Sequence, residues 1–141
     1  MIAYFDTSAL VPLFIDEPST ERCTLMWNEA TRVVSVRLLY PEARAALAMA
    51  ERASRITHAQ HAAAISELDD IVTEIDHVEL TADLARLAGD VAQAHGLRGY
   101  DAVHLAAAST VADADLVVVT GDADLGAAAT AMGIAVALTT S

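Results

Sequence analysis

The amino-acid sequence predicts an α/β fold, a three-layer α/β/α sandwich around a five-stranded parallel sheet. Five short apolar runs alternate with longer segments of helical periodicity along the chain, and such alternation is typical of α/β proteins. Four of the runs are apolar at nearly every position, which indicates strands buried on both faces. The segments between them are rich in alanine, the strongest helix former, as in residues 43–53 and 102–108.

The N-terminal part of the chain predicts a strand, two helices and a second strand. These elements cover Ile2–Phe5, Ala9–Ile15, Pro18–Ala30 and Val33–Val36. Ile2–Phe5 is an unbroken apolar run, and Val33–Val36 is rich in β-branched residues, so both are expected as strands. A polar turn over residues 6–8 separates the first strand from the first helix, and Pro12 is tolerated in the first turn of that helix.

The middle of the chain predicts two helices and a third strand. They cover Arg37–Arg52, Thr57–Ile75 and His77–Leu80. Apolar residues recur at helical spacing in both helices, at positions 39, 43, 47 and 50 of the first and 65, 68, 72 and 75 of the second. Each helix is therefore expected to pack one apolar face against the sheet.

The C-terminal part predicts three more helices and two strands. In chain order they cover Thr81–Gly96, Asp101–Val111, Leu116–Thr120, Asp122–Gly133 and Ile134–Leu138. Thr81 is expected to cap the first of these helices, and Gly96 is expected to stop it, because glycine readily takes the left-handed conformation found at helix ends.

The composition is that of one compact domain, which we expect to span residues 1–141. The chain is 55% hydrophobic and has no repeat, linker or low-complexity segment. Its single cysteine, Cys23, excludes an internal disulfide and is expected as a small buried side chain. Neither a signal peptide nor an uncharged apolar run long enough for a membrane span is found, so we expect a cytoplasmic protein.

The charge of the chain is strongly acidic. The net charge is −12, and all eight basic residues are arginines. Nucleic-acid binders usually carry a basic face, because phosphate contacts supply most of their affinity. Either this chain does not bind nucleic acid, or bound cations and a few arginines do that work. The acidity also suits a basic protein partner.

Candidate functional residues follow the strands. In a parallel α/β sheet, ligand sites form at the carboxyl ends of the strands, near the point where the strand order reverses. Asp6 follows the first strand, and Asp122 follows the fourth, with Asp124 close by. Glu42 and Asp101 stand in otherwise apolar segments, where a carboxylate seldom lies without a partner.

The residues alone leave two explanations of these carboxylates open. Taken singly, Asp6 suits a turn, and Asp101 and Asp122 suit helix N-caps. Gathered at one edge, the carboxylates would repel one another unless protons, basic partners or a cation intervened. Oxygen ligands without histidine or cysteine select Mg²⁺ or Mn²⁺, and such sites are typical of phosphoryl transfer, including nucleases.

Four segments of the chain resemble the motifs of PIN domains, in particular those of VapC-type ribonuclease toxins. They are Tyr4–Leu10 (YFDTSAL), Tyr40–Leu47 (YPEARAAL), Leu97–Ala108 (LRGYDAVHLAAA) and Val119–Asp122 (VTGD). The resemblance spans nearly the whole chain, and the third segment is the most specific.

This resemblance implies the strand order 3-2-1-4-5, which reverses between the first and fourth strands. It also implies a toxin of a type II toxin–antitoxin system, an endoribonuclease that cleaves structured RNA of the tRNA or rRNA class. The implied partners are a second copy of the chain, as a homodimer, and a VapB-type antitoxin with a basic tail, in a higher assembly. The acidic positions of the family fall on Asp6, Glu42, Asp101 and Asp122, and its accessory hydroxyls on Ser8 and Thr120.

The expected mechanism is in-line attack of a metal-activated water on a phosphodiester. Asp6, Asp101 and Asp122 are expected to hold Mg²⁺, with Mn²⁺ as an alternative. Glu42 is expected to orient or deprotonate the water, or to help hold a second ion.

The remaining polar residues near the motifs keep two interpretations each. Ser8 and Thr120 are expected to orient a metal-bound water or the scissile phosphate, although turn bonding explains them as well. Asp124 is an alternative to Asp122 as the last ligand. Arg98 either contacts an RNA phosphate or forms a surface ion pair. His104 is expected to be a packed, hydrogen-bonded residue outside the site.

Two other functions fit these residues less well. A catalytically silent, acidic binding module of the same fold would not need the full set of four carboxylates. A haloacid-dehalogenase-type phosphatase needs an Asp-x-Asp motif and a lysine, but Ser8 stands at the second position and the chain has no lysine. For an antitoxin, the acidic pocket is expected to accept an arginine or lysine of the tail, with Leu13, Phe14 and Trp27 as an apolar anchor.

Overall fold

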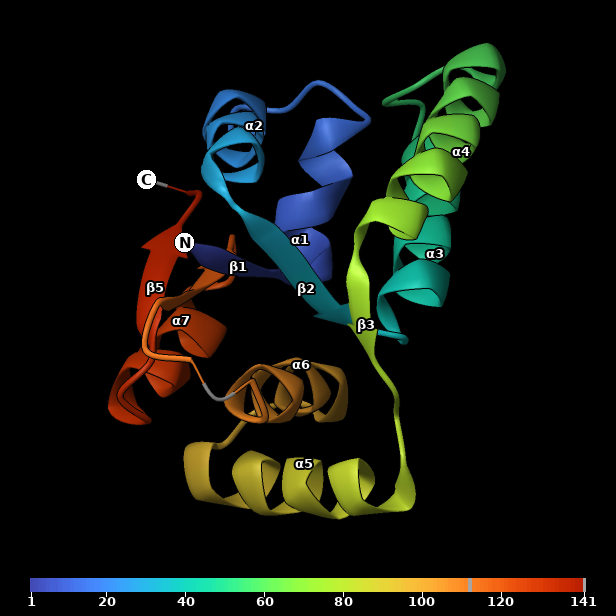
Figure 1. Ribbon diagram of the computed structural model, residues 1–141. Coiled ribbons are helices and arrows are strands. Elements are labelled where there is room, and N and C mark those ends of the chain that lie inside the picture. The colour runs from blue at the N-terminus through green and yellow to red at the C-terminus, as the bar shows by residue number, and fades with distance from the viewer. Residues whose placement is uncertain (112, 141) are drawn as a thin grey trace.

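The sheet has five parallel strands in the order β3-β2-β1-β4-β5, as expected (Figure 1). The protein is described by a computed structural model over residues 1–111 and 113–140. The strands are β1 (Ile2–Phe5), β2 (Arg32–Val36), β3 (Asp76–Val78), β4 (Leu116–Thr120) and β5 (Ala135–Leu138). Ala3 of the central strand pairs with Val33 on one side and with Val117 on the other. The strand order therefore reverses between β1 and β4.

Seven α-helices connect the strands in the described part of the chain. They are α1 (Thr7–Leu10), α2 (Thr20–Glu29), α3 (Leu39–Arg52), α4 (His58–Ile71), α5 (Ala82–His95), α6 (Gly99–Ser109) and α7 (Ala123–Ala131). Short 3₁₀ turns follow α1 and α4, at Val11–Leu13 and Val72–Glu74. No helix in the described residues is long and apolar enough to cross a membrane.

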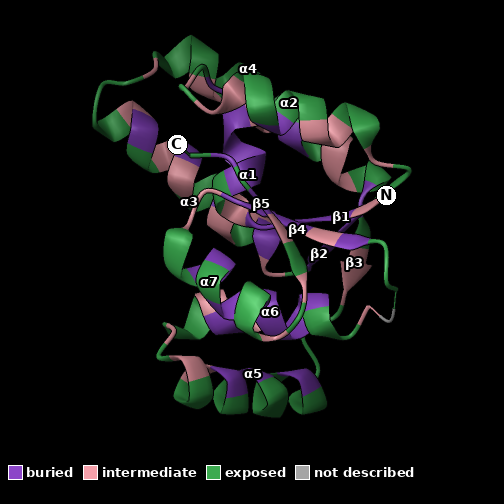
Figure 2. Cartoon of the chain, turned by 90° about the vertical axis from the view of Figure 1, so that its left-hand side faces the viewer, coloured by how far each residue is buried: buried purple, intermediate pink, exposed green. Residues whose placement is uncertain are grey.

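The helices form two layers, one on each face of the sheet (Figure 2). Alternate residues of β1 supply both layers, because successive side chains of a strand point to opposite faces. Phe5 packs with α1, α2 and α3, together with buried Leu39 and Cys23. Tyr4 packs with α5, α6 and α7, together with buried Leu105. The central strands β1 and β4 are buried on both faces, as their apolar sequences predict. The edge strands β3 and β5 are largely exposed or half-buried.

Two helix boundaries that bear on the site differ from the expectation. α1 begins at Thr7 rather than Ala9, because the carboxylate of Asp6 accepts a hydrogen bond from the N–H of Ala9 and caps the helix. α6 begins at Gly99, with Arg98 in the N-cap position, so Asp101 lies inside the first turn instead of opening the helix.

Three further boundaries are set by strand pairing and by helix ends. β3 ends at Val78 rather than Leu80, because it pairs with β2, whose last residue is Val36. The N–H of Arg37 still bonds the carbonyl of Val78, at 2.9 Å, and α3 accordingly starts two residues later than expected. The helix predicted to reach Ile75 ends instead in a 3₁₀ turn.

The predicted caps of α5 are confirmed. The hydroxyl of Thr81 accepts a hydrogen bond from the N–H of Leu84 at its N-terminus. Gly96 closes the helix with a φ of 64°, a conformation that glycine adopts without the strain of a side chain. These two residues set the ends of α5, which packs against α6. Asp101 and His104, which line the cavity described below, lie on α6.

Candidate active site

A cavity of about 450 Å³ lies at the carboxyl edge of the sheet, where β1 and β4 end. All four predicted carboxylates line it, namely Asp6, Glu42, Asp101 and Asp122. They come from four separate segments: the end of β1, α3, α6 and the start of α7. The fold therefore brings together side chains that the sequence places far apart.

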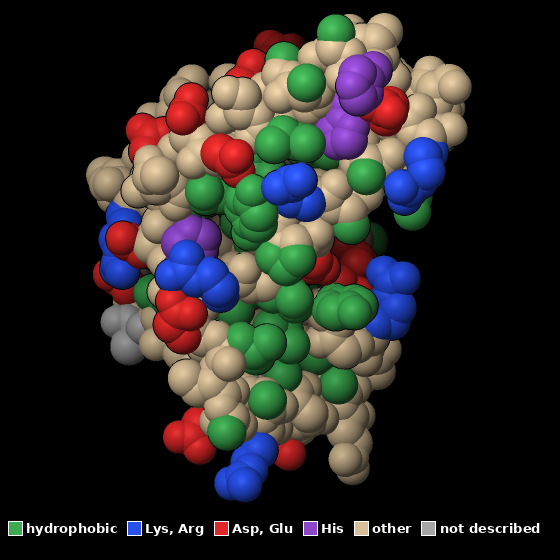
Figure 3. Space-filling view, turned by 90° about the vertical axis from the view of Figure 1, so that its right-hand side faces the viewer, with side chains coloured by type: hydrophobic (Ala, Val, Ile, Leu, Met, Phe, Trp, Pro, Cys, Tyr) green, Lys and Arg blue, Asp and Glu red, His purple; other side chains and the backbone are tan. Residues whose placement is uncertain are grey.

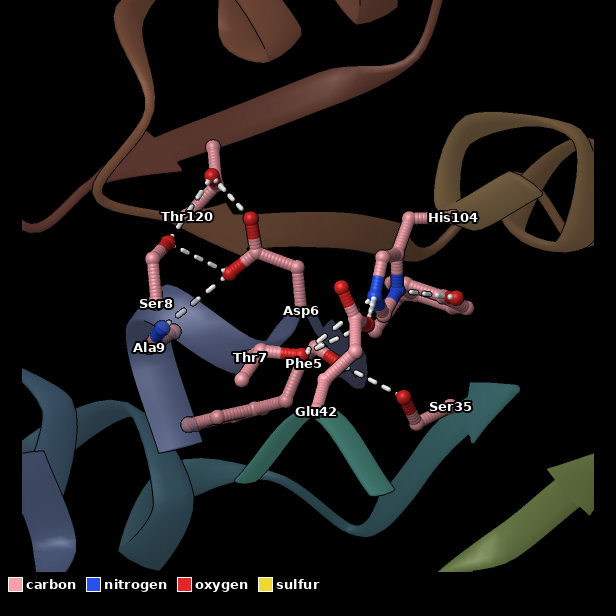
Figure 4. A network of polar contacts seen from close by, with 10 residues as sticks. Phe5, Asp6, Thr7, Ser8, Ala9, Ser35, Glu42, His104 and Thr120 are labelled. Carbon is pink, nitrogen blue, oxygen red and sulfur yellow. Dashed lines mark hydrogen bonds and ion pairs between the residues drawn. The ribbon is translucent and has the colours of Figure 1, made fainter. Parts of the chain in front are cut away.

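Asp6 is the most buried of these carboxylates, with 4% of the residue exposed. Its Oδ1 accepts hydrogen bonds from the Ser8 hydroxyl at 2.7 Å and from the N–H of Ala9 at 3.0 Å, and its Oδ2 accepts one from Thr120 (Figure 4). No basic side chain among the described residues forms an ion pair with it. Burial raises the pKa of the Asp6 carboxyl, against the influence of nearby His104 and the three donors, which lower it. A buried carboxylate with this surrounding is a favourable place for a cation.

Glu42 lies in the first turn of α3 and is held at one oxygen. Its Oε1 accepts a hydrogen bond from the Thr7 hydroxyl at 2.9 Å and lies 2.6 Å from Nε2 of His104 (Figure 4). The other ring nitrogen of His104, Nδ1, lies 2.9 Å from the hydroxyl of Tyr4. His104 was expected outside the site, but it lines the cavity and bonds a predicted catalytic residue.

Asp122 and Asp124 have different surroundings. The carboxylate of Asp122 caps α7 by accepting hydrogen bonds from the N–H groups of Asp124 and Leu125, and it lines the cavity. Asp124 is exposed on the first turn of α7 and is not among the cavity-lining residues. The geometry therefore favours Asp122 over Asp124 as the functional carboxylate.

Asp101 pairs with the one arginine of the third motif. Nε of Arg98 lies 3.3 Å from Oδ2 of Asp101, and both residues line the cavity. The Arg98 side chain is 85% exposed, so this ion pair contributes little to stability and is easily exchanged for another anion. Both interpretations of Arg98 made from the sequence are compatible with this placement.

Hydroxyl groups gather beside Asp6 at the end of β4. The Ser8 hydroxyl accepts the N–H of Gly121 at 2.8 Å and lies 3.4 Å from the Thr120 hydroxyl. A Cβ at Gly121 would lie 3.1 Å from Oγ1 of Thr139, so a larger residue would crowd this corner. Thr139 also lines the cavity, and its buried Oγ1 has no hydrogen-bond partner among the described residues.

The donor set fits a hydrated magnesium ion better than a closed metal cage. In the described residues, no three acidic, histidine or cysteine side chains are grouped closely enough to enclose an ion. Mg²⁺ usually binds one or two carboxylates and keeps several of its waters, so such a cage is not required. The buried Asp6 carboxylate, without a basic partner, supplies the oxygen ligand that such an ion prefers.

The sequence did not predict seven polar residues of the cavity, which are Thr7, Glu17, Ser19, Arg55, His104, Thr139 and Thr140. Thr7 was assigned to a turn, although it begins α1 and points toward Glu42. His104 follows Asp101 by three positions, which places both on one face of α6. Thr139 carries no signal, because it reaches the cavity only through the pairing of β5 with β4.

Two further hollows lie on the surface of the protein. One, of about 630 Å³, is lined beside β3 by apolar residues that include Leu38, Pro41 and Leu80. The other, of about 760 Å³, lies along α5 and α6 and shares Glu42, Arg98 and Asp101 with the site. Figure 3 shows the face beside β3, where hydrophobic side chains gather in a band between charged ones.

Comparisons with known proteins identify the family of the chain. The PIN domain model matches residues 3–131. Ribonuclease VapC45 of Mycobacterium tuberculosis is 43% identical over 136 residues, which cover 96% of this chain and 94% of that protein.

Two solved structures share the fold at lower identity. M. tuberculosis VapC20, described as a sarcin-ricin loop cleaving toxin, is 20% identical with a TM-score of 0.68, over 89% of this chain and 94% of that chain. A toxin–antitoxin complex from Klebsiella pneumoniae is 18% identical with a TM-score of 0.61, over 89% and 90% of the two chains. At these identities, the likeness shows the fold alone.

Proposed function

The chain belongs to the PIN-domain family as a VapC-type member, and from this premise we propose that it is a metal-dependent endoribonuclease, the toxin of a type II toxin–antitoxin pair. The observation that carries the proposal is the set of Asp6, Glu42, Asp101 and Asp122, which line one cavity at the carboxyl edge of the sheet. The high identity to a ribonuclease over nearly the whole chain supports the same activity. The proposed domain spans residues 1–141.

Three carboxylates are proposed to hold a divalent cation, Mg²⁺ or Mn²⁺. Asp6 supplies a buried oxygen ligand, and Asp101 and Asp122 supply two more from α6 and α7, directly or through water. When bound, such a cation lowers the pKa of a water and stabilises negative charge on phosphate oxygens. Asp124 remains on the surface, outside this set.

The other polar side chains bind and orient the reactants. Glu42 orients the attacking water and accepts its proton, because a carboxylate near the site of attack serves as a general base. Ser8 and Thr120 keep Asp6 in place. Ser8 lines the cavity and presents its hydroxyl to the scissile phosphate or its water, whereas Thr120 is fully buried and acts only through Asp6. Arg98 exchanges Asp101 for an RNA phosphate, which its exposed guanidinium can bind with two hydrogen bonds.

The proposed substrate is structured RNA of the tRNA or rRNA class. The support is the description of VapC20 as a toxin that cleaves the sarcin-ricin loop. A protein with a net charge of −12 gains little from long-range attraction to RNA. Recognition by the shape of a loop, with one or two arginine contacts, is therefore the expected mode.

The proposed partners are an antitoxin with a basic tail and a second copy of the chain. The acidic cavity suits an arginine or lysine of the tail, and the resemblance to the toxin–antitoxin fold supports such a complex. Leu13, Phe14 and Trp27 are half-buried against the core, and Trp27 packs edge-on against Phe5 at 5.6 Å, so only their outer surfaces serve as an anchor. The exposed apolar side chains of Leu80 and Tyr100 favour a further protein contact, as in a homodimer.

The test is cleavage of structured RNA by the purified protein, with and without Mg²⁺. Cleavage should require the cation and stop with a chelator. Asp101→Asn should lower the rate by about two orders of magnitude or more in a folded protein. Full activity in chelator would contradict the metal-dependent mechanism. A folded protein that binds an antitoxin but cleaves no RNA would instead support the silent binding module.

A further inference from the structure

His104 is a buried histidine to which no role has been given in the reaction. Its residue is 2% exposed, and it lies on α6, in the helical layer opposite to α3. Its ring contacts Tyr4 of β1 through Nδ1, at 2.9 Å, and Glu42 of α3 through Nε2, at 2.6 Å. One ring thus connects the central strand with a proposed catalytic carboxylate (Figure 4).

The direction of these hydrogen bonds follows from the chemistry of the groups. Burial raises the pKa of Tyr4 well above its ordinary value, so the phenol keeps its proton and can donate it to Nδ1. A carboxylate oxygen has no proton to donate, so Nε2, the ring nitrogen that contacts Glu42, carries a proton. That N–H points at Oε1 of Glu42, which as a carboxylate oxygen only accepts.

Two donors therefore hold the same oxygen of Glu42. The Thr7 hydroxyl donates to Oε1 at 2.9 Å, beside Nε2 of His104. No donor among the described residues forms a hydrogen bond with Oε2, and Glu42 lines the cavity. A free glutamate side chain samples many rotamers, and the two bonds to Oε1 select one of them.

We propose that His104 is a positioning residue: with Tyr4 behind it, its ring holds Oε1 of Glu42 so that Oε2 faces the substrate. This inference rests on the proposed function. Orienting a base in advance lowers the barrier, since a misplacement of about 1 Å in an active site can cost about 100-fold in rate. The contact acts on kcat rather than on RNA binding, because His104 is only 2% exposed and both of its ring nitrogens are engaged by Tyr4 and Glu42.

The same ring also packs between the helical layers, so the test must separate position from packing. His104→Gln keeps an N–H donor near Oε1, whereas His104→Leu keeps only volume. We expect kcat to fall at least about 10-fold in His104→Leu with KM unchanged, and to recover in large part in His104→Gln. Tyr4→Phe should give a smaller loss of kcat, because Nε2 still reaches Glu42. Leu105→Val, a neighbouring core position on α6, is the control for packing.

A double-mutant cycle with Glu42→Gln tests whether His104 acts through Glu42. His104→Leu should cost several-fold less in kcat in the Glu42→Gln background than in the wild type. Equal losses in both backgrounds, or a His104→Gln variant no more active than His104→Leu, would overturn the proposal. So would a Leu105→Val variant of matched thermal stability with the same loss of kcat.

A spectroscopic readout tests the geometry without cleavage. The ¹⁵N spectrum of the His104 ring should show a protonated Nε2 and an unprotonated Nδ1, and Glu42→Ala should shift the Nε2–H resonance. A ring protonated on Nδ1 alone would contradict the proposal. Inactive wild-type protein in Mg²⁺ would instead reject the proposed function, so the two failures are distinguishable.

Discussion

The carboxylate of Asp122 accepts a hydrogen bond from the backbone N–H of Asp124 at 2.9 Å, so the first aspartate supports the helix on which the second lies. Asp122 faces the cavity, whereas Asp124 is exposed. Two residues of the same type, two positions apart, therefore have different parts in the protein. The difference can be measured directly.

Asp122→Asn should abolish most of the ribonuclease activity, and Asp124→Asn should leave it nearly unchanged. Asparagine is as good an N-cap as aspartate, so α7 should keep its start and its stability in both variants. The loss in Asp122→Asn then reports the missing charge. Cleavage rates and thermal unfolding of the two variants provide the measurement, and equal rates would contradict the assignment.

Asp6→Asn should raise the thermal stability of the metal-free protein while it abolishes activity. An unpaired buried carboxylate costs free energy, and the isosteric amide removes the charge and keeps an acceptor for Ser8 and Ala9. A gain of about 1 kcal/mol, or a few degrees in Tm, is expected in chelator.

Mg²⁺ supplies the control for that experiment. A ligand that binds the native state raises the Tm, so Mg²⁺ should stabilise the wild type and not Asp6→Asn. If the ion shifted both melting temperatures equally, Asp6 would not be its ligand.

Thr139→Val should stabilise the protein, whereas Thr120→Val should destabilise it. The buried hydroxyl of Thr139 has no partner in the described residues, and an unpaired buried polar group costs roughly 1–3 kcal/mol. The hydroxyl of Thr120 bonds Asp6, and its loss leaves the carboxylate with one donor fewer. Chemical unfolding of the two variants at one pH compares them. A destabilised Thr139→Val would mean that the hydroxyl has a partner in solution.

Arg98→Gln should raise KM for RNA several-fold with little change in kcat. If Arg98 contacts one phosphate, its removal should also reduce the salt dependence of binding by about one contact. Arg86→Gln, at an exposed position of α5 outside the cavity lining, removes the same charge and is the matched control. Identical effects of the two variants would point to net charge alone.

A basic antitoxin tail should inhibit more weakly as Mg²⁺ increases. An arginine or lysine that pairs with the carboxylates of the cavity competes with the cation for the same oxygens. Neutralising the key basic residue of the tail should restore much of the cleavage while binding of the antitoxin largely persists. An inhibition titration at low and high Mg²⁺ measures this. A neutralised tail that inhibits like the wild type under both conditions would place the inhibition elsewhere on the surface.

The sequence predicted the sheet well because its strands carry strong local signals. β1 and β4 are unbroken apolar runs, and the polar residues that follow them, Asp6 and Asp122, mark the edge where the cavity lies. Thr81 and Gly96 fixed the ends of α5, since capping depends on a residue and its immediate neighbours. Glu42 and Asp101 stood out as carboxylates in apolar segments, but their assignment to the same site as Asp6 followed from the resemblance to a family.

The sequence was less informative where pairing over a distance decides the structure. The end of β3 depends on the length of β2, and the place of Thr139 depends on β5 pairing with β4. The contacts of His104 depend on α3 and α6 meeting above the sheet edge, from opposite layers. A histidine in an apolar helix therefore gives no local sign of the carboxylate that it reaches.

Cys23 is buried where α2 covers the sheet, so its reaction with a thiol reagent reports local opening of the protein. It is the one thiol of the chain, and burial raises its pKa, so the native state offers a modifying reagent little reactive thiolate. The thiol becomes reactive when α2 lifts from the sheet or when the whole domain unfolds. The rate of thiol labelling therefore reads how often this layer opens, without any introduced probe. Slower labelling in the presence of the antitoxin would show that the partner keeps α2 packed on the sheet.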